Sequence, residues 1–325
     1  MRMKSFYVII NPHANFGKGK DDWQKIQNYL DEHKIDYHFQ ETAIVGDAKK
    51  LTINFINHLK YSELKNKVII AVGGMSTLNE VLTGIKKADR GDIPLGFIPI
   101  GRHRQFADDI GIAQDPLLAL HQILNATDPI DYSIVQYHET NHEQTGYFLS
   151  NYEIGTGANI AYIEKRKSQS WLNRHWRWIF KLINICKAYY NNTDPFYVTL
   201  RVNERYKFYK KVMLVNLRNH AHEVDFENDR PSLNLVVINK VPIFSFLILA
   251  LVAKWGSILK LPFVNEWKTT QLHITINSLE HTQIDNHEIG GKYNDLYLKL
   301  VKYPFWINID SVPLEKRRHD EKNKK

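Results

Sequence analysis

The stretch Val72–Asn79 reads V-G-G-M-S-T-L-N and joins the apolar, β-rich run Lys67–Val72 to the helical pattern Leu78–Ile85. A strand that ends in paired glycines and opens a helix brings backbone N–H groups and the positive end of a helix dipole to one place. That geometry binds phosphate. Glycine also lets the backbone approach an oxyanion closely, because it has no Cβ. The same pattern also occurs as a simple tight turn, so this stretch alone leaves both interpretations open.

A second glycine-bearing loop favours the phosphate interpretation. The segment Phe6–Lys20 reads F-Y-V-I-I-N-P-H-A-N-F-G-K-G-K, an apolar strand followed by a loop in which glycines alternate with lysines. Asn11 can brace a turn through its side chain, and Pro12 fixes φ just after the strand. Two such loops after neighbouring parallel strands would lie side by side at the carboxyl edge of the sheet, where open α/β folds bind ligands.

A third segment, Leu95–Gly111, completes a recognisable pattern: L-G-F-I-P-I-G-R-H-R-Q-F-A-D-D-I-G. Together the three segments resemble the catalytic domain of the diacylglycerol kinase family, which includes bacterial lipid kinases. That family carries N-P-x-S-G-x-G, G-G-D-G-T-L-N-E-V and P-x-G-T-x-N-D-F-A-R-x-L-G in this order. The counterparts here are Asn11–Gly19, Gly73–Val81 and Pro99–Gly111. The resemblance covers nearly the whole chain, because three further segments have counterparts: Glu41–Lys49, Asn151–Ile160 and Gln283–Glu288.

The composition is that of a soluble globular protein. The 325 residues can form one large or two ordinary domains, with 43% hydrophobic and 24% charged residues. The single cysteine, Cys186, excludes an internal disulfide and fits a reducing cytosol. The N-terminus has no signal peptide pattern. We therefore expect a cytoplasmic protein, with peripheral membrane association as an option.

The net charge of +8 predicts a polyanionic partner. The sequence contains no zinc-ligand spacing and no RNP motif, so an anionic membrane surface is favoured over nucleic acid. The tail from Glu315 is net positive, and its simplest interpretation is a solvated segment. A homodimer is a further option that the sequence leaves open.

The order of predicted elements indicates an α/β fold with two domains. Strands alternating with helices up to about Leu124 imply a small parallel-sheet nucleotide-binding domain. Strands are predicted at Ser5–Ile10, Asp36–Gln40, Val68–Val72 and Leu95–Pro99, and helices at Asp21–His33, Ala48–Leu59, Thr77–Lys87 and Asp115–Leu124. Further β-rich runs predict a mainly antiparallel second domain: Tyr132–Tyr137, Gln144–Tyr152, Pro195–Val202, Tyr206–Leu217, Ser232–Ile238, Thr269–Asn277 and Leu296–Leu300.

These patterns divide the chain into residues 1–127, residues 128–314 and a basic tail, residues 315–325, with the option that a C-terminal strand returns to the first domain. The family resemblance implies that the second domain is a larger β-sandwich for the lipid substrate and that the active site lies in the cleft between the domains.

Two helical segments interrupt the β-rich part. Ser168–Tyr190 combines tryptophans on one side with basic residues, which is typical either of a membrane-interface helix or of a helix packed against the sheet. Pro242–Phe263 begins with an apolar run that ends at Lys254, short of the ~20 residues needed to span a bilayer. The resemblance favours a lipid contact for it, and a buried helix is the alternative.

The resemblance implies ATP as the nucleotide and assigns its phosphate and nucleotide contacts to the glycine loops and their neighbours. These candidates are Asn11, Gly17, Lys18, Thr42, Gly73, Gly74, Ser76, Thr77 and Arg102. Ser76 replaces a family glycine and adds a Cβ where close approach is expected. Arg102, His103 and Arg104 form a basic cluster that either binds an anion directly or is a solvated loop.

The positions that the resemblance assigns to metal binding have changed. Met75 replaces the aspartate of G-G-D-G-T, and a thioether is a poor ligand for magnesium. Arg104 and Gln105 stand at the family's Asn-Asp pair, while Asp131 is left as a candidate metal ligand. Magnesium is therefore a doubtful cofactor of this chain.

The family's D-G-E motif, which holds the base for the lipid hydroxyl, has become Asp285-Asn286-His287-Glu288. His287 takes the base position without a gap, and Glu288 takes it with a shift of one residue. Asp285, His287 and Glu288 are therefore the catalytic candidates.

Three functional hypotheses follow. The first is an ATP-dependent lipid kinase, acting on diacylglycerol or a related lipid, with degraded catalytic motifs. The second is an inactive nucleotide- and lipid-binding pseudokinase that serves as a sensor or partner protein. The third is a kinase for a soluble substrate, as in the related NAD kinases, against which the long apolar segment argues.

Overall fold

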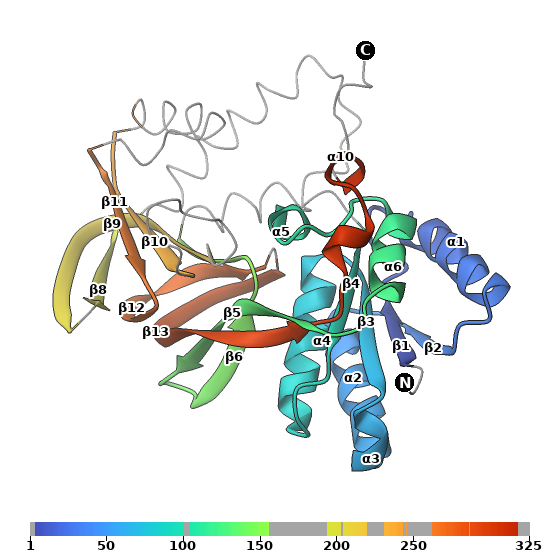
Figure 1. Cartoon of the computed structure of the whole chain (residues 1–325). Helices are drawn as coiled ribbons and strands as arrows, with labels where there is room; N and C mark the ends of the chain where they lie inside the picture. The colour runs from blue at the N-terminus through green and yellow to red at the C-terminus, as the bar shows by residue number, and fades with distance from the viewer. Residues whose placement is uncertain are drawn as a thin grey trace. The chain divides into compact units, whose positions relative to one another are not determined.

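The computed structural model describes residues 4–100, 105–155, 194–202, 204–219, 231–242, 245, 262–285 and 287–317 (Figure 1). The chain divides into two compact units. Unit 1 comprises residues 1–134, 222–224 and 301–325, and unit 2 comprises residues 135–221 and 225–300. The mixed α/β fold predicted from the sequence is confirmed, while the predicted cleft between the domains stays a prediction.

Unit 1 is built on a parallel sheet in the order β2-β1-β3-β4, with the end of one further strand beside β4. The strands are β1 (Ser5–Ile10), β2 (Tyr37–Glu41), β3 (Lys67–Gly73), β4 (Leu95–Pro99) and β13 (His287–Phe305). The central three, β1, β3 and β4, are buried along nearly their whole length. Such continuous apolar runs are typical of parallel strands that are covered on both faces.

The helices of unit 1 form two packed pairs, α2 against α4 and α1 against α6, which cover opposite faces of the sheet (Figure 1). The helices are α1 (Gly19–Glu32), α2 (Asp47–His58), α3 (Tyr61–Leu64), α4 (Met75–Ala88), α5 (Gln105–Asp109), α6 (Pro116–Leu124), the 3-10 turn η3 (Ile309–Ser311) and α10 (Leu314–Arg317). Asp115 caps α6 by accepting hydrogen bonds from the backbone of Leu117 and Leu118.

Unit 2 is a large antiparallel sheet. Its strands are β5 (Ile130–Glu139), β6 (Gln144–Phe148), β7 (Asn151–Gly155), β8 (Phe196–Val202), β9 (Arg205–Asn219), β10 (Leu233–Asn239), β11 (Val264–Thr269), β12 (Gln271–Ile284) and most of β13. The order is β11-β10-β9-β7-β12-β13, β8 bridges β9 and β12, and β5 lies between β13 and β6. One face of these strands forms a core of buried Val, Leu, Ile and aromatic side chains.

Several predicted boundaries in unit 2 are wrong for a physical reason. The predicted strand Gln144–Tyr152 is two strands, β6 and β7, because the N–H groups of Leu149 and Ser150 donate to the carboxylate of Asp285 at 2.8 and 2.7 Å instead of to a neighbouring strand. The run predicted at Leu296–Leu300 is only a part of β13. The sequence prediction also lacked β11 and the short helices α3 and α5.

The predicted helix at Ser168–Tyr190, Cys186 and most of Pro242–Phe263 lie outside the described residues. None of the helices within the described ranges is long and apolar enough to cross a bilayer.

Gly84 tests the packing of α2 on α4. A Cβ at Gly84 would lie 2.6 Å from the Cβ of Thr52 and 2.8 Å from the carbonyl oxygen of Lys49. Alanine is a better helix former than glycine by about 1 kcal/mol, so helix propensity alone predicts that Gly84→Ala stabilises the protein. We expect the opposite, a loss of about 1–3 kcal/mol in the free energy of unfolding, because the two helices must move apart.

Urea unfolding of Gly84→Ala and of Lys87→Ala, an exposed change on the same helix, measures this effect. A higher unfolding midpoint for Gly84→Ala would contradict the packing described here.

Candidate functional site

The residues that directly follow β1, β3 and β4 lie together at the carboxyl ends of these strands. The backbone N–H of Asn11 donates to the carbonyl of Val72 at 2.9 Å, and the N–H of Ile100 donates to the carbonyl of Gly73 at 2.8 Å. Asn11 Nδ2 also donates to Thr77 Oγ1 at 3.3 Å. The first loop is thereby fixed to the start of α4, and the glycine segments that the sequence singled out are brought together in unit 1.

The N-terminus of α4 is open to a ligand. Gly74 is the N-cap residue, and no side chain caps this helix end. The first N–H groups of an α-helix have no intrahelical acceptor, and the helix dipole adds a partial positive charge at the same place. Among the described residues, a Cβ on Gly74 would have only the carbonyl oxygen of Ile100 nearby, at 3.9 Å. The arrangement is one that binds phosphate groups.

Gly73 and Gly19 are required by close packing inside this site. A Cβ on Gly73 would lie 2.7 Å from Thr77 Oγ1, and one on Gly19 would lie 2.6 Å from the carbonyl oxygen of Asn11. Each glycine therefore lets its own loop fold tightly, Gly73 against the first turn of α4 and Gly19 against the start of the loop after β1. Gly17 has a different role, because its φ of 89° is in the left-handed region and the space around it is open.

The remaining candidates of unit 1 lie around these loops. Lys18 is exposed at the start of α1, so its ammonium group is available to an anion. Thr42 is buried directly after β2, and its N–H donates to the carbonyl of Ile10 at 2.9 Å. Thr77 is buried and Ser76 is half-buried in the first turn of α4. Arg102 lies outside the described residues.

Glu80 is a residue of this site that the sequence reasoning did not single out. Its Oε1 accepts a hydrogen bond from the N–H of Gly46 at 2.9 Å, which joins the start of α2 to α4. The signal was available, because Glu80 is the glutamate of the stretch that matches L-N-E-V.

The candidate metal ligands do not form a cluster. Met75, which occupies the family's aspartate position, is only 5% exposed, and its thioether is packed in the core. Asp131 is exposed on β5. In the described parts of the chain, no three His, Cys, Asp or Glu side chains come together in a way that could hold a metal ion. The described residues therefore do not fit magnesium, which requires hard oxygen ligands.

Asp285 lies in unit 2 and is already occupied by hydrogen bonds. Its carboxylate is fully buried and accepts hydrogen bonds from three consecutive backbone N–H groups, at 2.8, 2.7 and 3.1 Å. The donors are Leu149, Ser150 and Asn151. The side chain therefore holds the link between β6 and β7, whereas His287 and Glu288 are half-buried at the start of β13.

Removal of this carboxylate is expected to destabilise unit 2. Asp285→Ala leaves three backbone donors without their acceptor, and a buried unsatisfied donor costs about 1–3 kcal/mol. We expect a loss of at least about 3 kcal/mol in the free energy of unfolding, measured by urea denaturation. The matched control is Asp310→Ala, whose side chain is 99% exposed and whose removal should change stability by less than ~0.5 kcal/mol. Equal stability of the two variants would show that the carboxylate has no such role.

Comparison with known proteins agrees with this geometry. Residues 5–135 match the model of the diacylglycerol kinase catalytic domain. YtlR of Bacillus subtilis, a provisionally named lipid kinase, is 29% identical over 176 residues, which are 53% of this chain and 53% of YtlR. The mitochondrial acylglycerol kinase of Homo sapiens is 33% identical over 143 residues, which are 40% of this chain and 32% of that protein. The chain thus spans about half, or less, of the length of these curated relatives.

A solved structure of a diacylglycerol kinase from Bacillus anthracis str. Sterne has a TM-score of 0.60 to this chain. The match covers 96% of this chain and 100% of that one, at 17% sequence identity. This likeness establishes the fold. The matched domain model identifies residues 5–135 as a diacylglycerol kinase catalytic domain.

Proposed function

We propose that this chain is a diacylglycerol kinase-like protein that binds ATP through the three loops of unit 1 and takes a lipid with a free hydroxyl group as its substrate. The observation that carries the proposal is the uncapped start of α4, where Gly74 leaves space in front of the helix and Asn11 holds the first loop against Thr77. Lys18 adds an exposed cation for the nucleotide phosphates.

Phosphoryl transfer in this protein is proposed to be weak. The reaction needs a cradle for the phosphates, a divalent ion on them and a group that positions the attacking hydroxyl. The first requirement is supported by the loop geometry. The second lacks support among the described residues, because Met75 is buried where the family has an aspartate. Loss of one such electrostatic contribution lowers the rate by about 10²–10³-fold.

The buried Met75 at the family's aspartate position also favours a second candidate function, a pseudokinase that binds nucleotide and lipid without turnover. Both functions share the nucleotide site and differ only in catalysis. Both are also consistent with a cytoplasmic protein that reaches its lipid at a membrane surface, which is our proposal for its location.

Nucleotide binding is tested by thermal unfolding with and without ATP. A ligand at one hundred times its Kd stabilises a protein by about 2.7 kcal/mol, so saturating ATP should raise the Tm by several degrees. Gly74→Ala should abolish this shift, because its methyl group fills the space where a phosphate would approach. Its own folding should be unchanged, because Gly74 has a φ of −89° that any residue adopts and no atom of the described residues lies closer than 3.9 Å to the new Cβ.

The control variant for this experiment is Thr83→Ala, farther along α4, which should retain the full ATP shift. If Gly74→Ala is shifted by ATP as much as the unchanged protein, the nucleotide does not use this helix end.

Catalysis is tested with labelled ATP, magnesium or manganese, and diacylglycerol in mixed micelles. Ordinary kinases turn over at about 1–100 s⁻¹, and we expect this chain to be at least ~10²-fold slower. Turnover above that of Lys18→Ala identifies a weak kinase, whereas turnover equal to that of Lys18→Ala, together with an ATP-dependent Tm shift, identifies a pseudokinase. A rate in the ordinary range would contradict the proposed loss of metal ligation.

A further inference from the structure

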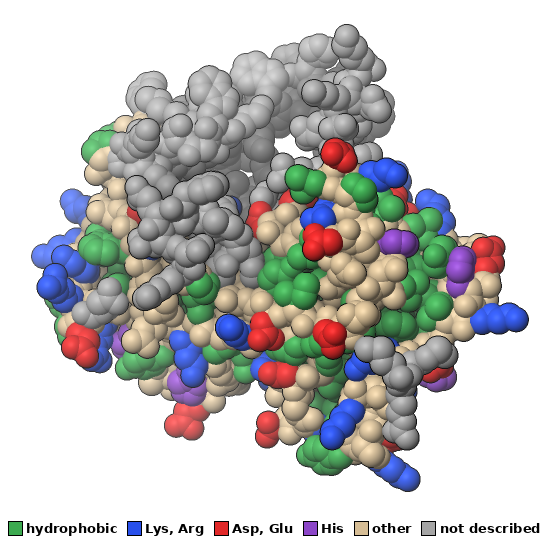
Figure 2. Space-filling view, viewed as in Figure 1, with side chains coloured by type: hydrophobic (Ala, Val, Ile, Leu, Met, Phe, Trp, Pro, Cys, Tyr) green, Lys and Arg blue, Asp and Glu red, His purple; other side chains and the backbone are tan. Residues whose placement is uncertain are grey.

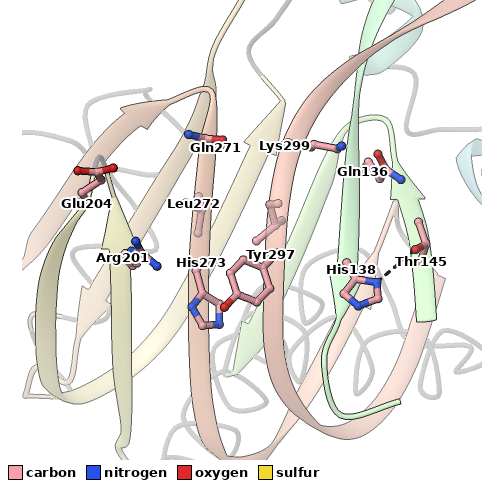
Figure 3. Close-up of a pocket in the computed structure, with 11 residues that line it drawn as sticks. Gln136, His138, Thr145, Arg201, Glu204, Gln271, Leu272, His273, Tyr297 and Lys299 are labelled. Atoms are coloured by element: carbon pink, nitrogen blue, oxygen red, sulfur yellow. Dashed lines mark hydrogen bonds between the residues drawn. The ribbon is translucent and has the colours of Figure 1, made fainter. Parts of the chain in front are cut away.

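One outward face of the sheet in unit 2 combines aromatic rings with cations. In the strand pairing, Tyr206 of β9 lies opposite Arg201 of β8, Arg201 lies opposite His273 of β12, and His273 lies opposite Tyr297 of β13. These four side chains form a row across four adjacent strands. Figure 3 shows Arg201, His273 and Tyr297 together on neighbouring strands.

Successive side chains along each strand point alternately to the core and to solvent, which separates this face from the core. Leu200, Ile274 and Leu296 are fully buried on the inner face, while their neighbours in sequence point outward. Three outward rings at β8 and β9 are unusually accessible. Tyr197, Tyr206 and Phe208 are 68, 57 and 69% exposed. Exposed aromatic side chains gathered in one region are typical of an interaction surface.

The same region is strongly positive. Residues 201–211 include five basic side chains and one acidic side chain, Glu204, which gives a local formal charge of +4. The basic residues are Arg201, Arg205, Lys207, Lys210 and Lys211, and all are exposed. Arg205 and Lys207 lie opposite the inward-pointing Val202 and Leu200, so these two belong to the other face of the sheet. Lys and Arg side chains gather at the end of unit 2 that carries β8 and β9 (Figure 2).

A hollow of about 570 Å³ on this face is lined by Arg201, His273 and Tyr297, among others (Figure 3). Arg201 and Lys299 contribute cations to its lining and Glu204 contributes one acid, while Gln136 and His138 contribute further polar groups. The ring of His273 is held in place by Asp295, 2.7 Å away, and by stacking on Tyr297 at 3.8 Å. The hollow is of a size that takes a small polar ligand.

We propose that this aromatic–basic face, defined by Tyr197, Arg201, Tyr206, Phe208, Tyr297 and Lys299, docks on an anionic membrane surface. The exposed rings insert into the headgroup region, which tyrosine and other amphipathic aromatic side chains favour. Arg201 and Lys299 meet lipid phosphate groups at the hollow. The inference rests on the proposed lipid-directed function, to which it adds the surface and the charge of the membrane.

The composition of the face favours a membrane over a protein partner. Lysine is depleted at protein–protein interfaces, whereas clustered lysine and arginine beside aromatic rings are attracted to anionic lipid. Residues 5–135 of the same chain match the diacylglycerol kinase catalytic domain model, which favours lipid phosphates over those of a nucleic acid as the partner of this face.

Vesicle sedimentation of the whole chain tests this inference. We expect binding to phosphatidylcholine vesicles that contain phosphatidylglycerol and much weaker binding to phosphatidylcholine alone. One cation near an anionic surface contributes about fivefold in affinity, so Arg201→Gln/Lys210→Gln/Lys299→Gln should weaken binding about 100-fold. Tyr206→Ala/Phe208→Ala should weaken it at least about tenfold, because two rings lose their burial. Added salt should weaken the binding of the unchanged protein.

The matched control is Lys25→Gln/Lys60→Gln/Lys87→Gln, which removes the same charge from exposed sites in unit 1 and should retain binding to within about threefold. All substituted side chains are exposed, so unfolding midpoints should be unchanged. Three results would overturn the inference: no binding of the unchanged protein to anionic vesicles, equal binding by the triple variant of the face, or tighter binding to a single-stranded oligonucleotide than to the vesicles.

The outcome is separable from that of the proposed function. The ATP-dependent Tm shift and turnover in uncharged micelles report on unit 1, and the variants of the aromatic–basic face should leave both unchanged. If the protein binds ATP but not vesicles, only the proposal of the docking surface is overturned. If it binds vesicles through this face but does not bind ATP, only the proposal of the nucleotide site is overturned.

Discussion

The close approach of the loops after β1, β3 and β4 is the constraint on which the proposed site depends. Two backbone hydrogen bonds, from Asn11 to Val72 and from Ile100 to Gly73, join the first residues after β1 and β4 to the end of β3. Within the first two loops, glycine stands where a Cβ would collide with Thr77 or with the backbone of Asn11. The binding groups are then mainly backbone N–H groups, which this chain keeps although its neighbouring side chains differ from those of the family.

Much of unit 1 could be predicted because its signals are local. The apolar runs of β1 and β4 are bounded as expected, and each helix shows a periodic apolar face that covers the sheet. The same reasoning located the glycine loops, because glycine placement depends on the backbone and is visible in a single sequence. Two elements were too short to give a periodic signal, namely α3 and α5.

Unit 2 was less predictable because its strands depend on distant partners. No property of the segment Gln144–Tyr152 indicates that a carboxylate more than one hundred residues away interrupts it, yet Asp285 does so. Likewise, the outward row from Tyr206 to Tyr297 joins residues from four strands and exists only once their register is known. The role of Asp285 could not be predicted for the same reason, because the sequence identifies the residue but not the backbone groups that donate hydrogen bonds to it.

The two units thus use different groups: the proposed phosphate site of unit 1 consists mainly of backbone N–H groups, whereas the proposed docking face of unit 2 consists of side chains. In unit 1, uncharged backbone groups and an exposed lysine offer a site for phosphate, and the buried Met75 separates that site from ordinary metal-dependent transfer. In unit 2, Asp285 is used for structure, while cations and aromatic rings are presented to solvent. These features are the basis of our two proposals, a nucleotide site in unit 1 and a membrane-docking face in unit 2.

Amide hydrogen exchange in the presence of a non-hydrolysable ATP analogue tests the central claim most directly. The account predicts that exchange slows at the backbone N–H groups of Gly74, Met75, Ser76 and Thr77 when the analogue saturates the protein, because these groups then donate to phosphate oxygens. Unchanged exchange at all four amides in the saturated protein would contradict it.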